Sequence, residues 1–146
     1  MNNFSIREMR EADLPSVLSI EKESFIQPWS EQSFKKELSI KFSRFFVAEN
    51  SDGEIAGFAG LWFYSGEGHI VNMAVKEEYR KSGIGKAFIE FLLSFARKNN
   101  LNSIFLEVAS KNTAAIHLYE SYGFKRYATR HNYYPQDNAI LMSLKI

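Results

Sequence analysis

The chain has 146 residues, of which 45% are hydrophobic, and its 18 basic and 17 acidic side chains leave a net charge of +1. This length and composition predict one domain, residues 1–146, with a hydrophobic core, and the balanced charge gives no reason to expect nucleic acid as a partner. The absence of cysteine excludes disulfides, thiolate nucleophiles and thiolate metal sites, and it suits a reducing compartment.

The N-terminal stretch Met1–Arg10 is polar and charged, which is unlike a signal peptide, and it contains a short predicted strand near Phe4. A helix is expected next, because Asp13 is a typical N-cap residue and Pro15 is tolerated in a first helical turn. The Pro-Trp-Ser run that ends at Ser30 breaks the chain, and its serine can cap a second helix.

Three strands are predicted in the middle of the chain, at Phe45–Ala48, Ile55–Tyr64 and His69–Val75. The Asp-Gly pair at 52–53 is a hairpin signal, and Ser65–Gly68 reads as another turn. The second strand is the longest apolar stretch, but glycines interrupt it and it is too short to cross a bilayer. We therefore expect a soluble, cytoplasmic protein that does not bind membranes.

A strongly periodic helix follows and ends at the asparagine pair 99–100. Its apolar stripe consists of Ile84, Phe88, Phe91, Leu92 and Phe95. The last four predicted elements are a strand, a helix closed by Gly123, and two strands, at Ile104–Val108, Asn112–Tyr122, Phe124–Thr129 and Ala139–Leu144. This order predicts a mixed, mostly antiparallel α/β sheet with about four helices on its two faces.

The sharpest local motif is Arg-Lys-Ser-Gly-Ile-Gly-Lys at residues 80–86, between a predicted strand and the most periodic helix. A helix N-terminus offers unpaired N–H groups and the positive end of a dipole, and glycines allow the backbone to approach an anion closely. The motif therefore predicts a pyrophosphate cradle. The alternative is that the glycines and lysines only begin a helix.

Two common nucleotide motifs do not fit. A P-loop would require a Lys-Ser or Lys-Thr pair, but Ala87 follows Lys86. A Rossmann fingerprint would require a third small residue where Phe88 stands. The pattern that remains is Arg-x-x-Gly-x-Gly after a strand.

Arg80-x-x-Gly83-Ile84-Gly85 after the strand Val71–Val75 resembles the acetyl-CoA loop of the GNAT acetyltransferase superfamily. The later run from Leu106 through Asn112 to Phe124 resembles the same superfamily, and so does the order of the elements over nearly the whole chain. The resemblance implies the GNAT fold and acetyl transfer from acetyl-CoA to an amine, without a metal.

A closer resemblance is to the RimI-like N-terminal acetyltransferases, which act on the α-amino group of a small-subunit ribosomal protein. It rests on the Pro-Trp-Ser run, on Glu107 with Asn112 and Tyr119, and on Arg-His-Asn-Tyr-Tyr-Pro at 130–135. One departure stands out, because the family pattern Glu-Val-Arg-x-Ser-Asn becomes Glu-Val-Ala-Ser-Lys-Asn here. Ala109 replaces the arginine and the serine is displaced, which makes the peptide preference harder to carry over.

The resemblance implies two groups of cofactor contacts. The strand edge would pair with the pantetheine arm, and a backbone N–H in it could face the thioester oxygen. The loop would bind the pyrophosphate, while Asn112 would both cap its helix and bond the pantetheine. The implied residues are Met73, Ala74, Val75, Arg80, Lys81, Ser82, Gly83, Ile84, Gly85, Lys86, Asn112 and Tyr119.

Two side chains are candidates for proton transfer. Glu107 is the expected general base, although strand alternation alone would make it a solvated surface residue. Tyr119 is the expected general acid toward the departing thiolate, although a helix aromatic is more often part of a core. In both cases the family resemblance favours the catalytic interpretation.

Tyr133 and Tyr134 lie in a predicted polar loop and are expected to form one wall of an acceptor-peptide groove, with hairpin packing as the alternative. Phe25 and Trp29 would line the other side. The three histidines lack ligand spacing, so no metal site is expected. The competing functions are acetylation of lysine or a small-molecule amine, a non-catalytic acyl-CoA-binding module and, more remotely, a nucleotide-binding protein.

Overall fold

The computed structural model describes residues 3–146, so Met1 and Asn2 of the predicted N-terminal stretch lie outside the described residues. One seven-stranded sheet has the order β1-β2-β3-β4-β5-β7-β6. The strands are β1 (Phe4–Glu8), β2 (Ser43–Asn50), β3 (Ile55–Tyr64), β4 (Glu67–Val75), β5 (Ser103–Ala109), β6 (Lys125–Tyr134) and β7 (Asp137–Lys145). The helices are α1 (Leu14–Ser24), α2 (Glu31–Leu38), α3 (Ile84–Lys98) and α4 (Thr113–Ser121).

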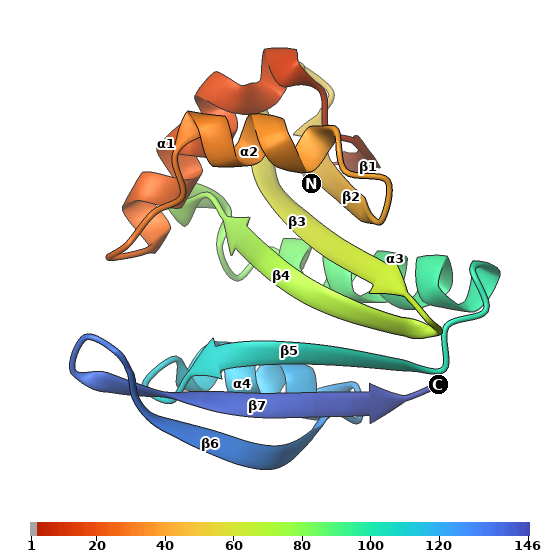
Figure 1. Cartoon of the computed structure of the whole chain (residues 1–146). Helices are drawn as coiled ribbons and strands as arrows, with labels where there is room; N and C mark the ends of the chain where they lie inside the picture. Colours follow the sequence, from red (N-terminus) through yellow and green to blue (C-terminus); the bar gives the residue numbers. More distant parts are fainter. Residues whose placement is uncertain (1–2) are drawn as a thin grey trace.

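The strand pairs are antiparallel except for β4 and β5, which run parallel. A parallel pair needs a long crossover, and α3 supplies it. Helices α1 and α2 cover one face of the sheet and α3 and α4 the other, as Figure 1 shows. The predicted mixed, mostly antiparallel sheet is therefore confirmed.

Each face of the sheet carries its own core. On the α3 side, Phe88 and Leu92 are almost fully buried, as their helical spacing predicts. On the other side, Phe34 of α2 packs at right angles against the rings of Phe45 and Phe58. The sheet is thereby held between two layers of helices, which makes it a rigid support for the loops at its ends.

The predicted caps are confirmed for two helices. The Ser30 hydroxyl accepts the Ser33 N–H at 3.2 Å, and the Asn112 side chain accepts the Ala115 N–H at 3.2 Å. Gly123 follows α4 with a φ of 95°, the left-handed conformation expected after a helix end.

The predicted role of Asp13 was wrong. It occupies the N-cap position of α1, but its carboxylate makes no cap hydrogen bond. It instead accepts two hydrogen bonds from the Arg7 guanidinium, at 2.8 and 2.9 Å, and one from the Arg10 N–H. The guanidinium holds the carboxylate because the bidentate pair makes two hydrogen bonds with charge on both partners, whereas a cap bond has charge on the carboxylate alone.

Candidate active site

The centre of the sheet opens where β4 and β5 separate. Their parallel register runs only from Glu67 opposite Ser103 to Ile70 opposite Leu106. Beyond Ile70 the strands diverge toward their C-terminal ends, as Figure 1 shows. The register with β3 also shifts here, leaving Val71 as an extra residue in β4. Because a bulge bends its strand, the edge of β4 at residues 73–75 has no strand partner on the β5 side, and this break in the strand pairing is called the slot below.

The N-terminus of α3 lies close to the end of β4 along the chain. Its N-cap, Gly83, has a φ of 90° and no side chain to accept a hydrogen bond, unlike the caps of α2 and α4. Lys81 also has a left-handed φ, of 64°. The first N–H groups of a helix have no partner within it, so this turn presents a set of donors suited to an anion.

The other loop residues divide between the protein and the surface. The Arg80 guanidinium donates to the Val75 carbonyl at 3.0 Å and to the Ser24 hydroxyl at 3.2 Å. The Ser82 hydroxyl donates to the Tyr79 carbonyl. The Arg80 bonds tie the loop to the ends of β4 and α1, while Lys81 and Lys86 of the same loop are exposed.

Helix α4 packs against the same loop. A methyl group added at Gly85 would lie 3.2 Å from Leu118, so the absence of a side chain at Gly85 lets the two helices approach closely. Tyr119 follows Leu118 and belongs to the core on this side of the sheet, only 7% exposed. Burial raises the pKa of Tyr119 to about 12, and among the described residues no group hydrogen-bonds its hydroxyl. A protonated phenol is thus held beside the loop.

Glu107 lies on the opposite face of β5. Its neighbours Leu106 and Val108 point into the α3-side core, so strand alternation turns the carboxylate toward the other face. The Glu107 carboxylate forms an ion pair with Arg130 of β6, with 3.2 Å between Oε1 and the guanidinium. The carboxylate and the Tyr119 phenol therefore flank β5 from its two sides.

The two tyrosines do not lie in a loop, contrary to the sequence prediction. Strand β6 extends to Tyr134, so both are at its end, and their rings meet at 5.0 Å and 83°. Burial, followed by the charge of Glu107, raises the pKa of Tyr134 to about 12. Pairing with Asp137 of β7 thus brings Tyr134 near the Glu107 carboxylate, and the Tyr133 ring contacts that of Tyr134.

Phe25 and Trp29, which were expected to line the other side of the peptide groove, have surroundings of their own. Phe25 is exposed directly after α1, whereas the Trp29 ring packs against Phe34 and Phe45 at 5.2 and 5.9 Å. Among the described residues, neither side chain forms a ring pair or hydrogen bond with Tyr133 or Tyr134. Packing of α2 against the sheet accounts for the Trp29 ring.

Sequence reasoning missed a buried carboxylate, that of Glu21, which joins the segment between α1 and α2 to β4. Glu21 of α1 is 1% exposed, and burial raises its pKa. It accepts the Trp29 N–H at 2.9 Å and the Asn72 side-chain amide at 2.9 Å. The bulge in β4 turns Asn72 toward α1, which no local sequence signal predicts.

Ser110, the serine that is displaced relative to the family pattern, forms a side-chain hydrogen bond. The Ser110 hydroxyl donates to the Asp137 carboxylate, and this hydrogen bond lowers the pKa of Asp137. The Lys111 N–H donates to the same carboxylate at 3.2 Å. The end of β5 is thereby attached to the start of β7.

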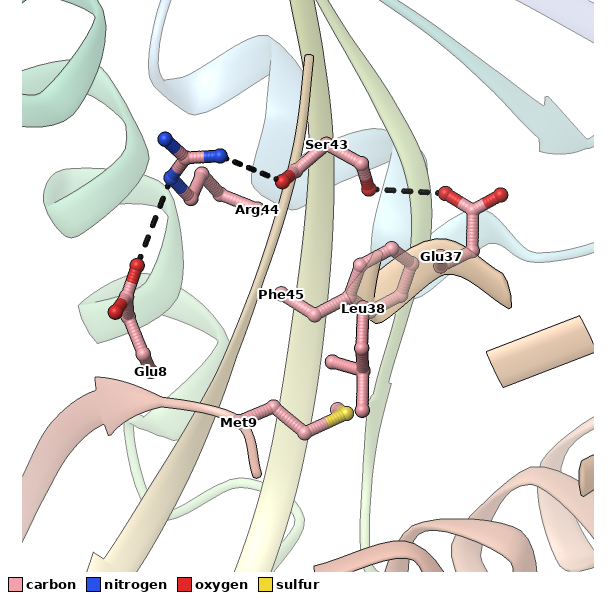
Figure 2. A pocket seen from close by; sticks show the side chains of 7 residues that line it. All are labelled: Glu8, Met9, Glu37, Leu38, Ser43, Arg44 and Phe45. Carbon is pink, nitrogen blue, oxygen red and sulfur yellow. Dashed lines mark hydrogen bonds and ion pairs between the residues drawn. The ribbon is translucent and has the colours of Figure 1, made fainter. Parts of the chain in front are cut away.

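Two open pockets lie elsewhere on the molecule. Figure 2 shows one of about 320 Å³ beside the start of β2, where the Ser43 hydroxyl donates to Glu37 at 2.9 Å and Arg44 pairs with Glu8 at 3.6 Å. A second, of about 350 Å³, lies between α1 and the β2–β3 hairpin. Neither is lined by a predicted site residue.

Within residues 3–146, no group of three potential metal-binding side chains occurs, and no helix is long and apolar enough to span a membrane. His69, for example, is stacked between the rings of Tyr64 and Phe105, at 5.7 and 5.3 Å.

Comparison with known proteins agrees with this geometry. Residues 14–124 match the acetyltransferase (GNAT) family. The "[Ribosomal protein bS18]-alanine N-acetyltransferase" of Escherichia coli is 35% identical, over 97% of both chains. An "N-alpha-acetyltransferase" of Sulfurisphaera tokodaii is 31% identical, over 96% of this chain and 92% of its own.

A solved structure of the Escherichia coli ribosomal-protein-S18-alanine N-acetyltransferase superimposes with a TM-score of 0.91 and 34% identity, covering 99% of this chain and 94% of that one. The family match, the similar sequences and the similar fold together show that the chain belongs to the acetyltransferase (GNAT) family of acetyl-CoA-dependent N-acetyltransferases.

Proposed function

We propose that this chain transfers the acetyl group of acetyl-CoA to the α-amino group of a protein N-terminus, with an N-terminal alanine of a small-subunit ribosomal protein as acceptor. The observation that carries the proposal is the slot between β4 and β5, with a donor-rich helix N-terminus at one end and a carboxylate beside two tyrosines on the acceptor face. The Escherichia coli relative, which is named for alanine of bS18, supports the choice of acceptor.

The donor would bind through the backbone. The N–H groups at residues 81–86 would hold the pyrophosphate, with charge from Lys81 and Lys86. The pantetheine would lie along the free edge of Met73–Val75 and reach Asn112. A backbone N–H in this edge would stabilise the oxyanion that forms as the amine attacks, an effect commonly worth about 3–4 kcal/mol.

Proton transfer would use the two groups on either side of β5. The α-amine loses a proton to Glu107, directly or through one water, as its nitrogen attacks the thioester carbon. The C–S bond then breaks, and the thiolate takes a proton from Tyr119. Because the pKa of Tyr119 is about 12, the phenol is protonated at neutral pH and enters the reaction as a donor.

The acceptor's acidity favours an N-terminus over lysine. With pKa values of about 8 and 10.4, roughly a tenth of α-amines but fewer than one in a thousand lysines are neutral at pH 7. A single, partly exposed carboxylate such as Glu107 is a sufficient base for the first and a weak one for the second. Tyr133 and Tyr134 would line the peptide's path to this carboxylate.

The test offers labelled acetyl-CoA to a peptide with a free N-terminal alanine, to the same peptide with a blocked N-terminus and an internal lysine, and to a polyamine. Label is expected on the first peptide alone. Glu107→Gln is expected to lower turnover by roughly 10²–10⁴. Glu67→Gln, on β4, is the control because, within residues 3–146, its carboxylate forms an ion pair with His69 alone. Label on the lysine or polyamine alone would reject the acceptor, and a loss under threefold in Glu107→Gln would reject the base.

A further inference from the structure

Arg130 contacts two parts of the candidate site at once. One face of its guanidinium lies over the Tyr133 ring, 5.5 Å from the centroid, and its Nη1 is 3.2 Å from the Glu107 carboxylate. Arg130 thus connects the proposed base on β5 with the tyrosine pair at the end of β6. Arg130 begins the run at 130–135 that carries the family resemblance, but the sequence did not predict its contact with Glu107, because that contact crosses an intervening strand.

The sheet register explains how the arginine reaches across. Arg130 lies opposite Ala139 of β7, and Ala139 lies opposite Ala109 of β5. Directly opposed residues in antiparallel strands project from the same face, so the three side chains form a row beside Glu107. The two alanines leave space for the arginine to cross β7, and Ala109 is the position where the family pattern carries its own arginine.

The ion pair has little to do with stability. The Arg130 side chain is 55% exposed and that of Glu107 is 34% exposed. Exposed pairs contribute about 0–1 kcal/mol to folding. The ion pair matters more for the reaction rate than for folding. A glutamate side chain has several rotamers, and a base displaced by 1 Å can cost on the order of 10²-fold in rate.

We propose that Arg130 is a positioning residue, which holds the Glu107 carboxylate in the orientation that receives the acceptor's proton and couples it to the peptide wall at Tyr133. This inference rests on the proposed function. Ala109 stands where the family pattern has an arginine, and its methyl side chain cannot bind a carboxylate. The guanidinium that pairs with Glu107 here comes from β6. The planar guanidinium suits the task, because it can stack on a ring while bonding a carboxylate.

The experiment compares Arg130→Gln, Arg130→Lys and the matched control Arg126→Gln. Arg126 lies on the same strand with the same exposure, but it pairs with Glu120 on α4 at 3.6 Å. We expect Arg130→Gln to lower kcat about tenfold, with the KM for acetyl-CoA and the melting temperature unchanged. Arg130→Lys should recover part of the loss, since its ammonium can reach the carboxylate without stacking equally well. Arg126→Gln should match the wild type.

A double variant separates positioning from other roles. In a Glu107→Gln background, Arg130→Gln should cause no further loss, because the carboxylate that it positions is absent. An equal tenfold loss in that background, or a kcat for Arg130→Gln within twofold of wild type, would overturn the inference. If Glu107→Gln were fully active while Arg130→Gln was not, Arg130 would act on the acceptor itself. Wild-type failure to label any N-terminal peptide would instead reject the proposed acceptor, and the same variants would then be compared on the amine that is labelled.

Discussion

Replacing Gly83 by alanine tests the anion cradle, and the chain contains a matched control. Gly83 and Gly53 have φ values of 90° and 83°, and at either position an added methyl group would have no atom within 4 Å. Both substitutions therefore introduce backbone strain without a steric clash. Gly53 lies in the β2–β3 turn, outside the candidate site, whereas Gly83 is the N-cap of α3.

The stability cost should be the same for both variants. A side chain in the left-handed conformation costs about 1–2 kcal/mol. The restricted unfolded chain offsets about 0.4–1 kcal/mol of this. Each variant should thus lose ~1 kcal/mol, or about 2–4 °C in melting temperature.

Coenzyme A affinity should distinguish them. If relief of strain at Gly83 turns one N–H away from the pyrophosphate, a charged hydrogen bond worth about 1.5–3 kcal/mol is lost. Calorimetry should then show roughly 10–100-fold weaker binding for Gly83→Ala. Gly53→Ala should bind like the wild type. Equal affinity in the two variants would show that the head of α3 does not bind the phosphates.

Three further changes test other parts of the structure. Tyr119→Phe should lower turnover roughly 10²-fold while leaving coenzyme A affinity and melting temperature nearly unchanged, because the hydroxyl makes no recorded hydrogen bond; lost affinity would instead indicate a binding role. Burial raises the folded pKa of Glu21, so its stabilising contribution is complete below the unfolded pKa of about 4.3 and is lost as pH rises through the folded value. Denaturant titrations should therefore show wild type losing stability relative to Glu21→Gln across that window, and a constant difference would contradict the assignment. Gly60→Ala would place a methyl group 2.2 Å from the Phe45 ring and should cost about 3 kcal/mol in unfolding free energy; a cost below about 1 kcal/mol would show that the ring moves freely.

Local chemistry made much of the fold predictable. The helix caps at Ser30 and Asn112 were confirmed because each depends on a bond to an N–H three residues away. The α3 stripe was predictable because a 3.6-residue period needs no knowledge of what packs against it. Asp13 failed as a cap because Arg7, on another element, competes for its carboxylate.

The end of β6 likewise shows that local sequence signals do not predict contacts between separate elements. Strand β6 was expected to end near Thr129, but it continues to Tyr134 because β7 pairs with it around a tight turn. Arg130 pairs with Ala139 and Tyr134 with Asp137 on either side of an irregularity, where the Asn132 N–H donates to the Asn138 side chain, and no local sequence pattern predicts these bonds. The two tyrosines consequently belong to a strand and not to a loop.

By itself, the sequence determined the order and type of the elements, the glycine-marked start of α3 and the positions of Glu107 and Tyr119 along the chain. Only the tertiary structure decided that β4 leaves β5 after Ile70, that Arg130 reaches Glu107 across Ala139, and that Glu21 meets Asn72, 51 residues away. The reason is physical. Periodicity, caps and turns depend on atoms a few residues apart, whereas strand register and bulges depend on how distant segments pair.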